Sequence, residues 1–280
     1  YLDNDDNKKW GYVNILETKD GTEVCSQLGS VSVKTKDYDY YTNFYVNFVE
    51  LDEDQNYITL GTNEELKFLP KSDVEKQIKS QIKQLGLPCE IYQMHFFTLS
   101  AKYLNDCQTR FFKEGIESIK GNDEQYKRKW KEKEGAYYVE IECKLDDTIL
   151  NGRKSMFSTN EEEFDKRYEI SCIYNKDGCV YMDVELFKID KKTEVTPIPV
   201  AQAVETIKKE LTDLITDDQF VLSDGELKYI IYDDDHEPGF KIIPVWILTV
   251  KQTYYSEDKG GKDTAEINYF VNAVTGEVLH

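Results

Sequence analysis

The sequence has few of the groups that acid–base chemistry near neutral pH requires. Its 280 residues include three histidines, His95, His236 and His280, although histidine is the usual proton shuttle in that range. It contains no HExxH zinc helix, GxSxG nucleophile elbow, glycine-rich phosphate loop or Rossmann glycine pattern. The sequence therefore predicts a protein that is not an enzyme and that has no resident cofactor.

Basic residues are the second shortage. The chain has 35 Lys and Arg against 54 Asp and Glu, which gives a net charge of -19. Residues 195–280 are the more acidic part, because they contain 7 basic and 16 acidic side chains, a net charge of -9. This field repels phosphate backbones and anionic lipids, so we expect no nucleic-acid partner. It would attract a cationic partner or a metal ion, or it keeps the surface hydrated.

Long apolar runs are also missing. A membrane-spanning helix needs about 20 consecutive apolar residues, and no run in the sequence approaches that length. The chain starts at Tyr1 with a polar stretch, YLDNDDNKK, of the kind left after an export signal or a lipid anchor. We therefore expect an extracytoplasmic protein, secreted or attached to the membrane through an upstream lipid anchor, although a cloned fragment would begin in the same way.

The cysteines do not form a metal-binding pattern. They lack CxxC pairs and zinc-finger spacing, and they are Cys25, Cys89, Cys107, Cys143, Cys172 and Cys179. In the predicted hairpin CIYNKDGC, Tyr174 pairs with Cys179, and Cys172 is then the diagonal neighbour of Cys179. Diagonal neighbours lie about 7–8 Å apart, longer than a relaxed disulfide prefers. A disulfide between Cys172 and Cys179 and free buried thiols are the two alternatives.

Aromatic residues are plentiful, with 20 Tyr among them, and they favour a sheet-rich fold. The period-two pattern of KDYDYYTNFYVNFVEL, residues 36–51, predicts a strand with one core face and one face of aromatic and amide side chains. Tyr41 and Tyr45 on that second face are candidate ligand-binding residues for a sugar or a peptide, and Trp246 is a third. Packing of the face against another element is the alternative.

The helices and the remaining strands follow from standard patterns. Ser72 and Glu75 predict a capping box, Val74, Ile78, Ile82 and Leu85 a buried stripe, and Gly86 the end of that helix. A second stripe, Val200, Val204, Ile207, Leu211 and Leu214, predicts a helix beginning near Pro199. Further helices are expected at 102–113 and 122–133, and strands at 10–17, 22–33, 90–99, 136–145, 167–174, 179–189, 227–232, 242–252 and 264–274.

Residues 151–160 lack periodicity and contain turn formers, so we place a domain boundary there. The prediction is an α+β protein of two domains, 1–155 and 156–280, each an antiparallel sheet with helix packed on one face.

An acidic cluster lies between two of the predicted strands. Asp233, Asp235, His236 and Glu237 could hold a hard cation such as calcium, because calcium accepts six to eight oxygen ligands in flexible geometry. The spacing is not that of an EF-hand, and a solvated acidic loop is the alternative.

From Thr196 onwards the chain resembles the PepSY family. The resemblance rests on Ile198-Pro199 leading into a helix, on Pro244-Val245-Trp246, and above all on FVNAVTGEVL at 270–279. PepSY-like domains end in an Asp-x-x-Thr-Gly-Glu type of turn, and Asn272 stands here in place of the Asp. The resemblance implies a cystatin-like α+β domain that binds or restrains a protein or peptide partner at the cell envelope, as in exported Gram-positive lipoproteins.

The sequence thus predicts a non-enzymatic extracytoplasmic binding or regulatory module, whose exposed sheet edge a partner strand could extend. A glycan-binding surface protein and a metal-assisted hydrolase built on the 233–237 loop are the alternatives.

Overall fold

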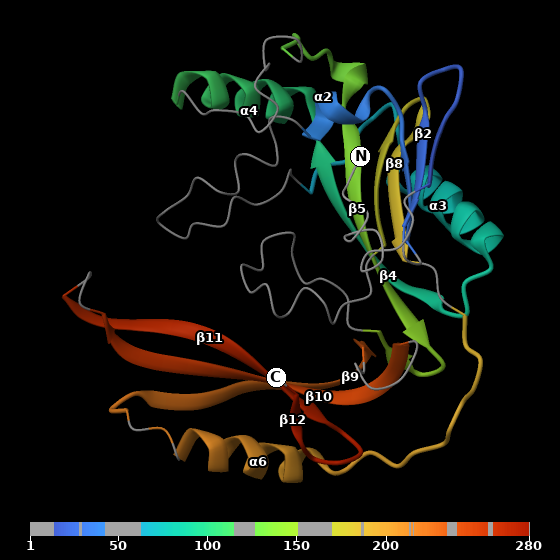
Figure 1. Cartoon of the computed structure of the whole chain (residues 1–280). Helices are drawn as coiled ribbons and strands as arrows, with labels where there is room; N and C mark the ends of the chain where they lie inside the picture. The colour runs from blue at the N-terminus through green and yellow to red at the C-terminus, as the bar shows by residue number, and fades with distance from the viewer. Residues whose placement is uncertain are drawn as a thin grey trace, which may run out of the picture. The chain divides into compact units, whose positions relative to one another are not determined.

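The computed structural model describes residues 14–27, 30–42, 63–114, 127–150, 170–185, 188–212, 214, 216–233, 240–256 and 260–279. They form two compact units (Figure 1). The first unit holds the described residues up to Glu142 together with 170–185 and Lys188, and the second holds 143–150 and those from Ile189 onwards. Antiparallel sheets with few helices make up both units, which confirms the predicted α+β class.

The first unit is built on a sheet with the strand order β1-β2-β3-β8-β7-β5-β4. The strands are β1 (Asn14–Glu17), β2 (Glu23–Gln27), β3 (Ser30–Lys34), β4 (Glu90–Leu99), β5 (Ala136–Leu145), β7 (Ile170–Asn175) and β8 (Gly178–Glu185). Glu23 pairs with Lys34 in the antiparallel β2–β3 ladder. The single strand expected over 22–33 is therefore two strands.

Helices cover both faces of this sheet. They are α2 (Tyr38–Thr42), α3 (Lys71–Leu85) and α4 (Ala101–Glu114), with a 3-10 turn, η3 (Glu132–Glu134). Figure 1 shows α3 on one face and α2 with α4 on the other. Tyr174 of β7 donates a hydrogen bond to Gln81 of α3, whereas its neighbour Ile173 packs in one cluster with Tyr41 and Leu104 of the opposite helices. Every residue of β7 is consequently buried.

The structure confirms helix α3 and corrects its start. Val74, Ile78 and Ile82 are buried, and Gly86 ends the helix in the left-handed conformation at φ 67°. The predicted capping box at Ser72 is wrong, because the N-cap is Pro70 and no side chain caps it.

The second unit is a sheet with the order β12-β11-β10-β9. Its strands are β9 (Gln219–Asp233), β10 (Phe240–Ser256), β11 (Gly261–Asn272) and β12 (Val278–Leu279), and its helix is α6 (Val200–Thr212). The unit also holds β6 (Thr148–Ile149), which pairs with the end of β5. Ala203 and Ile207 of α6 are buried in one cluster with Leu248, Val250 and Val271.

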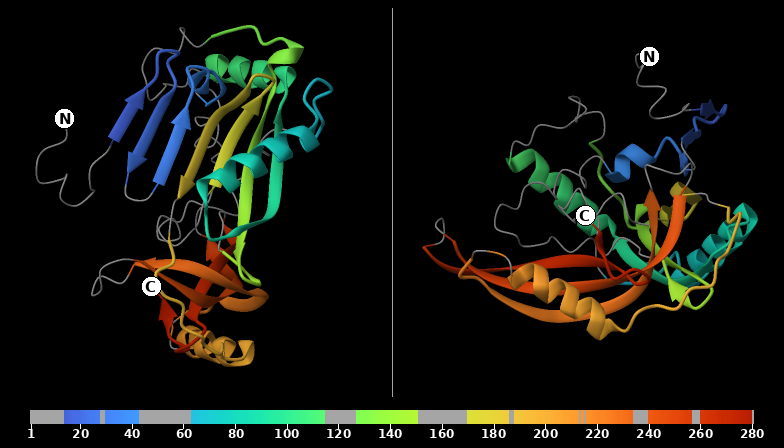
Figure 2. Two further views of the ribbon diagram at one scale, coloured as in Figure 1. Left: turned by 90° about the vertical axis from the view of Figure 1, so that its right-hand side faces the viewer. Right: turned by 60° about the horizontal axis from the view of Figure 1, so that its bottom comes forward.

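Helix α6 is much shorter than the strands that it covers. Its 13 residues extend about 20 Å, whereas the 17 residues of β10 extend about 55 Å along the strand. Figure 2 accordingly shows the hairpin of β10 and β11 reaching past the end of the helix. Helix α6 therefore covers one part of this sheet face.

Two predicted features need correction. The predicted domain 156–280 includes the strand pair at 170–185, yet β7 pairs with β5 and β8 pairs with β3, so both lie in the first sheet. Periodicity alone could not show this, because strands far apart in sequence complete the sheet. The strand expected over 36–51 is wrong at Tyr38–Thr42, which is helix α2, and the remainder of its pattern lies outside the described residues.

Candidate functional site

Tyr41, the first predicted ligand-binding residue, is a core residue. Its side chain is 4% exposed, and its hydroxyl donates to the Glu134 carbonyl oxygen at 2.8 Å and accepts from Asn175 Nδ2 at 3.4 Å. Burial raises the pKa of Tyr41 to about 12. The exposed aromatic face predicted from the sequence is therefore absent at Tyr41, and Tyr45 lies outside the described residues.

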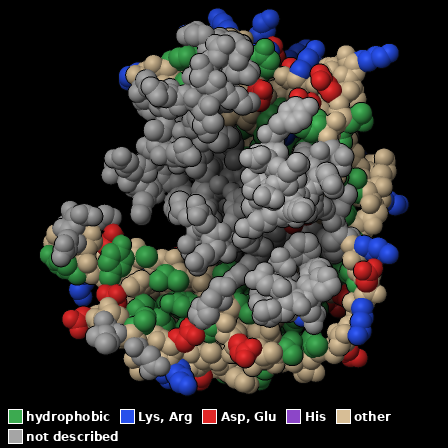
Figure 3. Space-filling model, in the orientation of Figure 1, with side chains coloured by type: hydrophobic (Ala, Val, Ile, Leu, Met, Phe, Trp, Pro, Cys, Tyr) green, Lys and Arg blue, Asp and Glu red, His purple; other side chains and the backbone are tan. Residues whose placement is uncertain are grey.

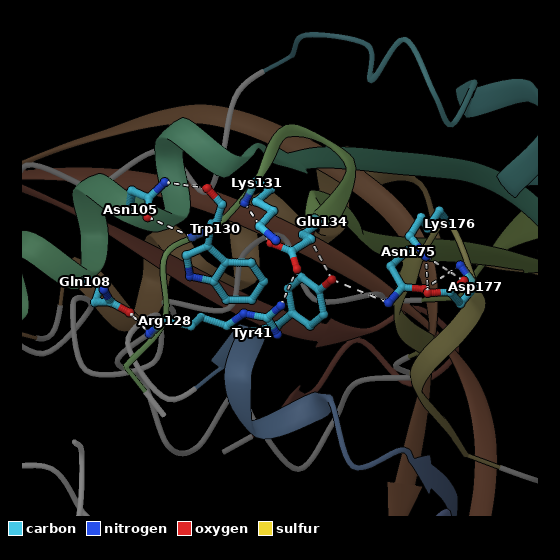
Figure 4. A network of polar contacts seen from close by, with 10 residues as sticks. All are labelled: Tyr41, Asn105, Gln108, Arg128, Trp130, Lys131, Glu134, Asn175, Lys176 and Asp177. Carbon is cyan, nitrogen blue, oxygen red and sulfur yellow. Dashed lines mark hydrogen bonds and ion pairs between the residues drawn. The ribbon is translucent and has the colours of Figure 1, made fainter. Parts of the chain in front are cut away.

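Tyr41 belongs to a network that fixes the segment before β5 (Figure 4). The Asn105 amide donates to the carbonyl oxygen of Trp130 and accepts from its backbone N–H, both at 3.1 Å. Gln108 Oε1 accepts from the Arg128 N–H at 2.9 Å. Two side chains of α4 thus hold residues 128–130 as a neighbouring strand would.

Arg128 contributes the guanidinium group of this network, and the carboxylate of Glu134 balances its charge. It lies 4.5 Å from the Trp130 ring centre and forms an ion pair with Glu134 at 2.6 Å. Partial desolvation favours a higher pKa for Glu134, but the Lys131 backbone N–H and Arg128 outweigh it and lower that pKa. Trp130 Nε1 meets no acceptor among the described residues. The groups of this network otherwise bind one another, so its role is to hold the segment in place.

Trp246, the third predicted ligand-binding residue, also has a structural partner. Its Nε1 donates to the Ile198 carbonyl oxygen at 2.9 Å, and its ring packs against the core under α6. Trp246 therefore ties β10 to the chain entering α6.

The turn of the predicted PepSY-like ending is tightly held. Asn272 Oδ1 accepts from the backbone N–H groups of Val274 and Thr275, at 2.8 and 3.1 Å, and Gly276 has φ 79°. The Ile198 N–H donates to the Ala273 carbonyl oxygen at 2.7 Å, which docks the turn beside the start of α6. An Asp carboxylate would accept the same two hydrogen bonds as Asn272.

The structure does not describe the predicted metal ligands. Asp235, His236 and Glu237 lie outside the described residues, and of Asp233 only the backbone, at the end of β9, is described. Among the described residues, no three His, Cys, Asp or Glu side chains are grouped to hold a metal ion. Calcium binding by the acidic loop stays a prediction.

The six cysteines are free thiols. Tyr174 pairs with Cys179 as predicted, but Cys172 pairs with Met182, and the disulfide alternative is wrong. Burial raises the pKa of the Cys179 thiol to about 11 and that of Cys172 well above its ordinary value. Neither thiol is therefore activated as a nucleophile.

The strongest candidate for a binding surface is the outer edge of β9. This strand is last in its sheet, so β10 pairs with one side of it. On its other side the described residues supply one bridge, a parallel one between Leu150 and Tyr229. Residues 221–225 are all exposed, with Val221 at 62% and Leu222 at 45%. We call the stretch Gln219–Gly225 the β9 edge.

The two faces of the sheet differ in chemistry along this strand. Leu222 lies opposite Val250 and Leu227 opposite Trp246, so both are on the face covered by α6. Asp224 and Glu226 lie opposite Thr249 and Ile247, on the other face. Between Leu222 and Leu227, one face of β9 is thus apolar and the other carries carboxylates, while Val221 and Ile230 on either side place apolar side chains on that second face.

Sequence patterns missed the β9 edge, because they predicted a strand only over 227–232. The pairing with β10 shifts between Thr249 and Val250, which leaves Ser223 as an extra residue whose Oγ donates to the Thr249 carbonyl oxygen at 3.0 Å. This bulge breaks the period-two pattern, and Ser-Asp-Gly is also typical of turns. Gly225 instead packs closely against the core, since a Cβ there would lie 3.2 Å from Leu248 Cδ2 and the leucine side chain would have to move slightly.

The β1 edge of the first sheet is a weaker candidate. Ile15 and Leu16 of β1 are 67% and 64% exposed, but β1 has four residues and can pair with only about four residues of a partner strand. On β4, at the opposite edge, Tyr92 is 52% exposed.

Figure 3 shows hydrophobic side chains in green along the second unit, with acidic side chains in red between them.

Comparisons with known proteins identify a related fold but no function. No family model matches the chain, and no curated protein matches it. The chain is similar to a crystal structure of an uncharacterized protein from Eubacterium rectale, with 14% identity and a TM-score of 0.57 over 96% of this chain and 76% of that one. The likeness shows a shared fold, and the resemblance to PepSY domains stays a prediction.

Within the described residues, no helix is both long and apolar enough to cross a membrane.

Proposed function

We propose that this protein is a non-enzymatic binding or regulatory module, acting outside the cytoplasm, that holds a protein partner by pairing a strand of the partner with the β9 edge. The observation that carries the proposal is the exposure of this edge, where residues 221–225 are all exposed next to the fully paired strand β10. The location outside the cytoplasm rests on the resemblance of residues 196–280 to PepSY domains.

An unpaired strand edge offers backbone N–H and C=O groups to a second chain. The bridge between Leu150 and Tyr229 shows that β9 accepts a neighbour on this side, farther along the strand. The open stretch of about seven residues is about 23 Å long, which is the length of an ordinary strand.

Side chains at the edge add specificity to this backbone pairing. A docked strand points alternate side chains to the two faces of the sheet, where they would meet Leu222 on one face and Val221 on the other. Both side chains are largely exposed in the free protein, so a partner would bury apolar surface on each face.

The test uses a blocked peptide of about seven residues that alternates Val and Thr, added to the full chain. We expect peptide binding to slow hydrogen exchange of the backbone amides of residues 219–225. The variant Leu222→Lys should abolish this protection, because lysine on an edge strand opposes strand addition.

The matched control is Tyr92→Lys, which places the same side chain on the exposed edge strand of the other sheet. It should leave peptide binding unchanged. Absence of binding, or protection at another strand with none at 219–225, would overturn the proposal.

A further inference from the structure

We infer that the partner strand alternates apolar and basic residues. This inference rests on the proposed function and specifies the chemistry of the partner that the β9 edge selects.

Asp224 and Glu226 set the basic positions, on the face of β9 that also carries Val221. Asp224 and Glu226 lie two residues apart on the face away from α6, as their pairing with Thr249 and Ile247 shows. Lys228 lies on that same face and forms an ion pair with Glu226 at 2.8 Å, which leaves Asp224 as the carboxylate without a basic neighbour on β9.

Asp224 remains available although it makes one local contact. Its Oδ1 accepts from the Gly225 N–H at 2.8 Å, and the residue is exposed. Lys251, on the neighbouring strand β10, also points to this face, but it lies directly opposite Glu266 of β11. The charge nearest the edge is therefore negative.

Acidic residues continue at the start of the strand. Asp217 and Asp218 precede β9, and Asp218 accepts from Gln252 Nε2 at 2.6 Å. Residues 216–228 thus contain four carboxylates and one lysine. A strand lying along the edge would run through this negative field, which favours Lys or Arg on the side chains that it turns to the same face.

The face covered by α6 sets the apolar positions. Leu222 and Leu227 point to it, and the side chains beside them are Val250 and Trp246 of the core. A partner side chain on this face would meet carbon atoms, so an apolar residue fits there. Because successive residues of a strand point to opposite faces, the two requirements together give the alternating pattern.

The same charges disfavour a second copy of this chain as the occupant. Two β9 edges paired with each other would bring Asp224 and Glu226 of both copies to one small region, where like charges repel. The net charge of -19 on each copy adds to that repulsion.

The test compares fluorescent, blocked peptides of equal length by anisotropy at about 0.1 M salt, with the full chain. One alternates Val and Lys, one Val and Thr, one Val and Glu, and one Gly and Lys. We expect the Val–Lys peptide to bind about tenfold more tightly than the Val–Thr peptide, roughly the effect of two or three exposed ion pairs. The Val–Glu peptide should bind most weakly.

A pair of charge-matched variants separates local from overall attraction. Asp224→Asn with Glu226→Gln should remove the preference for Val–Lys over Val–Thr and keep the Val–Thr affinity. Asp73→Asn with Glu75→Gln on α3 changes the net charge equally, at exposed positions, and should keep the preference. A melting curve of each variant shows that it is folded.

Each outcome decides one of the two proposals. Equal binding of the Val–Lys, Val–Thr and Val–Glu peptides with protection of 219–225 would overturn the inference and leave the proposed function standing. Binding of Gly–Lys as tight as that of Val–Lys would also overturn the inference, because attraction would then need no strand. No protection of 219–225 by any peptide would refute the proposed function itself.

Discussion

Strands β7 and β9 lie in different sheets and have opposite surroundings. All residues of β7 are buried, from Ile170 to Asn175, because helices cover both faces of its sheet and strands flank both of its sides. Most residues of β9 between Gln219 and Gly225 are exposed, because α6 covers part of one face and β10 pairs with one side. The difference separates a strand that lies in the core from one whose outer edge is exposed.

The largest expected effect is in the core of the first unit, on strand β5. Tyr137→Ala should lower the free energy of unfolding by about 4 kcal/mol, because the side chain is fully buried and the change leaves a large cavity. It also removes the hydroxyl that accepts from the Leu66 N–H at 2.6 Å. Urea unfolding measures the loss. The control Tyr92→Ala, at a 52% exposed site, should cost less than about 0.5 kcal/mol, and similar losses in both variants would contradict the comparison.

The second effect is a loss of stability in alkali. Burial raises the pKa of Tyr41 from 10.0 to about 12 and that of Cys179 from 9.0 to about 11. For each group, at a pH between its unfolded and its folded pKa, the unfolded chain releases the proton that the folded chain keeps. Stability is therefore complete below about pH 9 and falls as the pH rises, by up to about 1.4 kcal/mol per pH unit for each group.

Unfolding midpoints in urea between about pH 8 and pH 11 measure this fall. Tyr41→Phe should lose the hydrogen bond to Glu134, about 1 kcal/mol at neutral pH, and should show a shallower fall above pH 10. An unchanged slope would show that Tyr41 does not contribute to it.

The comparison also explains what the sequence could predict. Apolar stripes predicted α3 and α6, because each helix buries residues at regular spacing, such as Val74 and Ile78 of α3. The predicted stripes were too long, since Leu85 and Leu214 are exposed. The period-two rule for strands failed at Tyr38–Thr42, where Tyr41 is buried by contacts with Trp130 and Glu134, about ninety residues away in sequence. Local alternation carries no information about such distant partners.

Binding surfaces were harder still to predict. The patterns found the central strand β10, whose apolar run includes Val245 and Leu248, but they missed the first half of β9, where the bulge at Ser223 hides the alternation. Trp246 as a ligand contact stays a prediction, and its indole N–H donates to the Ile198 carbonyl oxygen before α6. An exposed edge is a property of strand order, and strand order cannot be read from one strand.

The third prediction concerns the turn that follows β11. Asn272→Ala should cost about 1–2 kcal/mol, because it removes an acceptor for the N–H groups of Val274 and Thr275. Asn272→Asp keeps an acceptor oxygen and should change stability by less than about 0.5 kcal/mol. Thermal melting of both variants checks this. Equal losses would show that the amide group itself, and not its oxygen, holds the turn.

The smallest expected change in the free energy of unfolding is at the β9 edge, where an exposed and a buried residue lie directly opposite each other. Leu222 lies directly opposite Val250, yet Leu222 is 45% exposed and Val250 is 2% exposed. Leu222→Lys should therefore change the free energy of unfolding by no more than about 0.5 kcal/mol, since the lysine stem can lie on the same surface with its ammonium in water. Val250→Ala, one strand inward, should cost about 2 kcal/mol. A loss above about 1.5 kcal/mol for Leu222→Lys would mean that this leucine already serves the fold, in which case the edge would not be free for a partner.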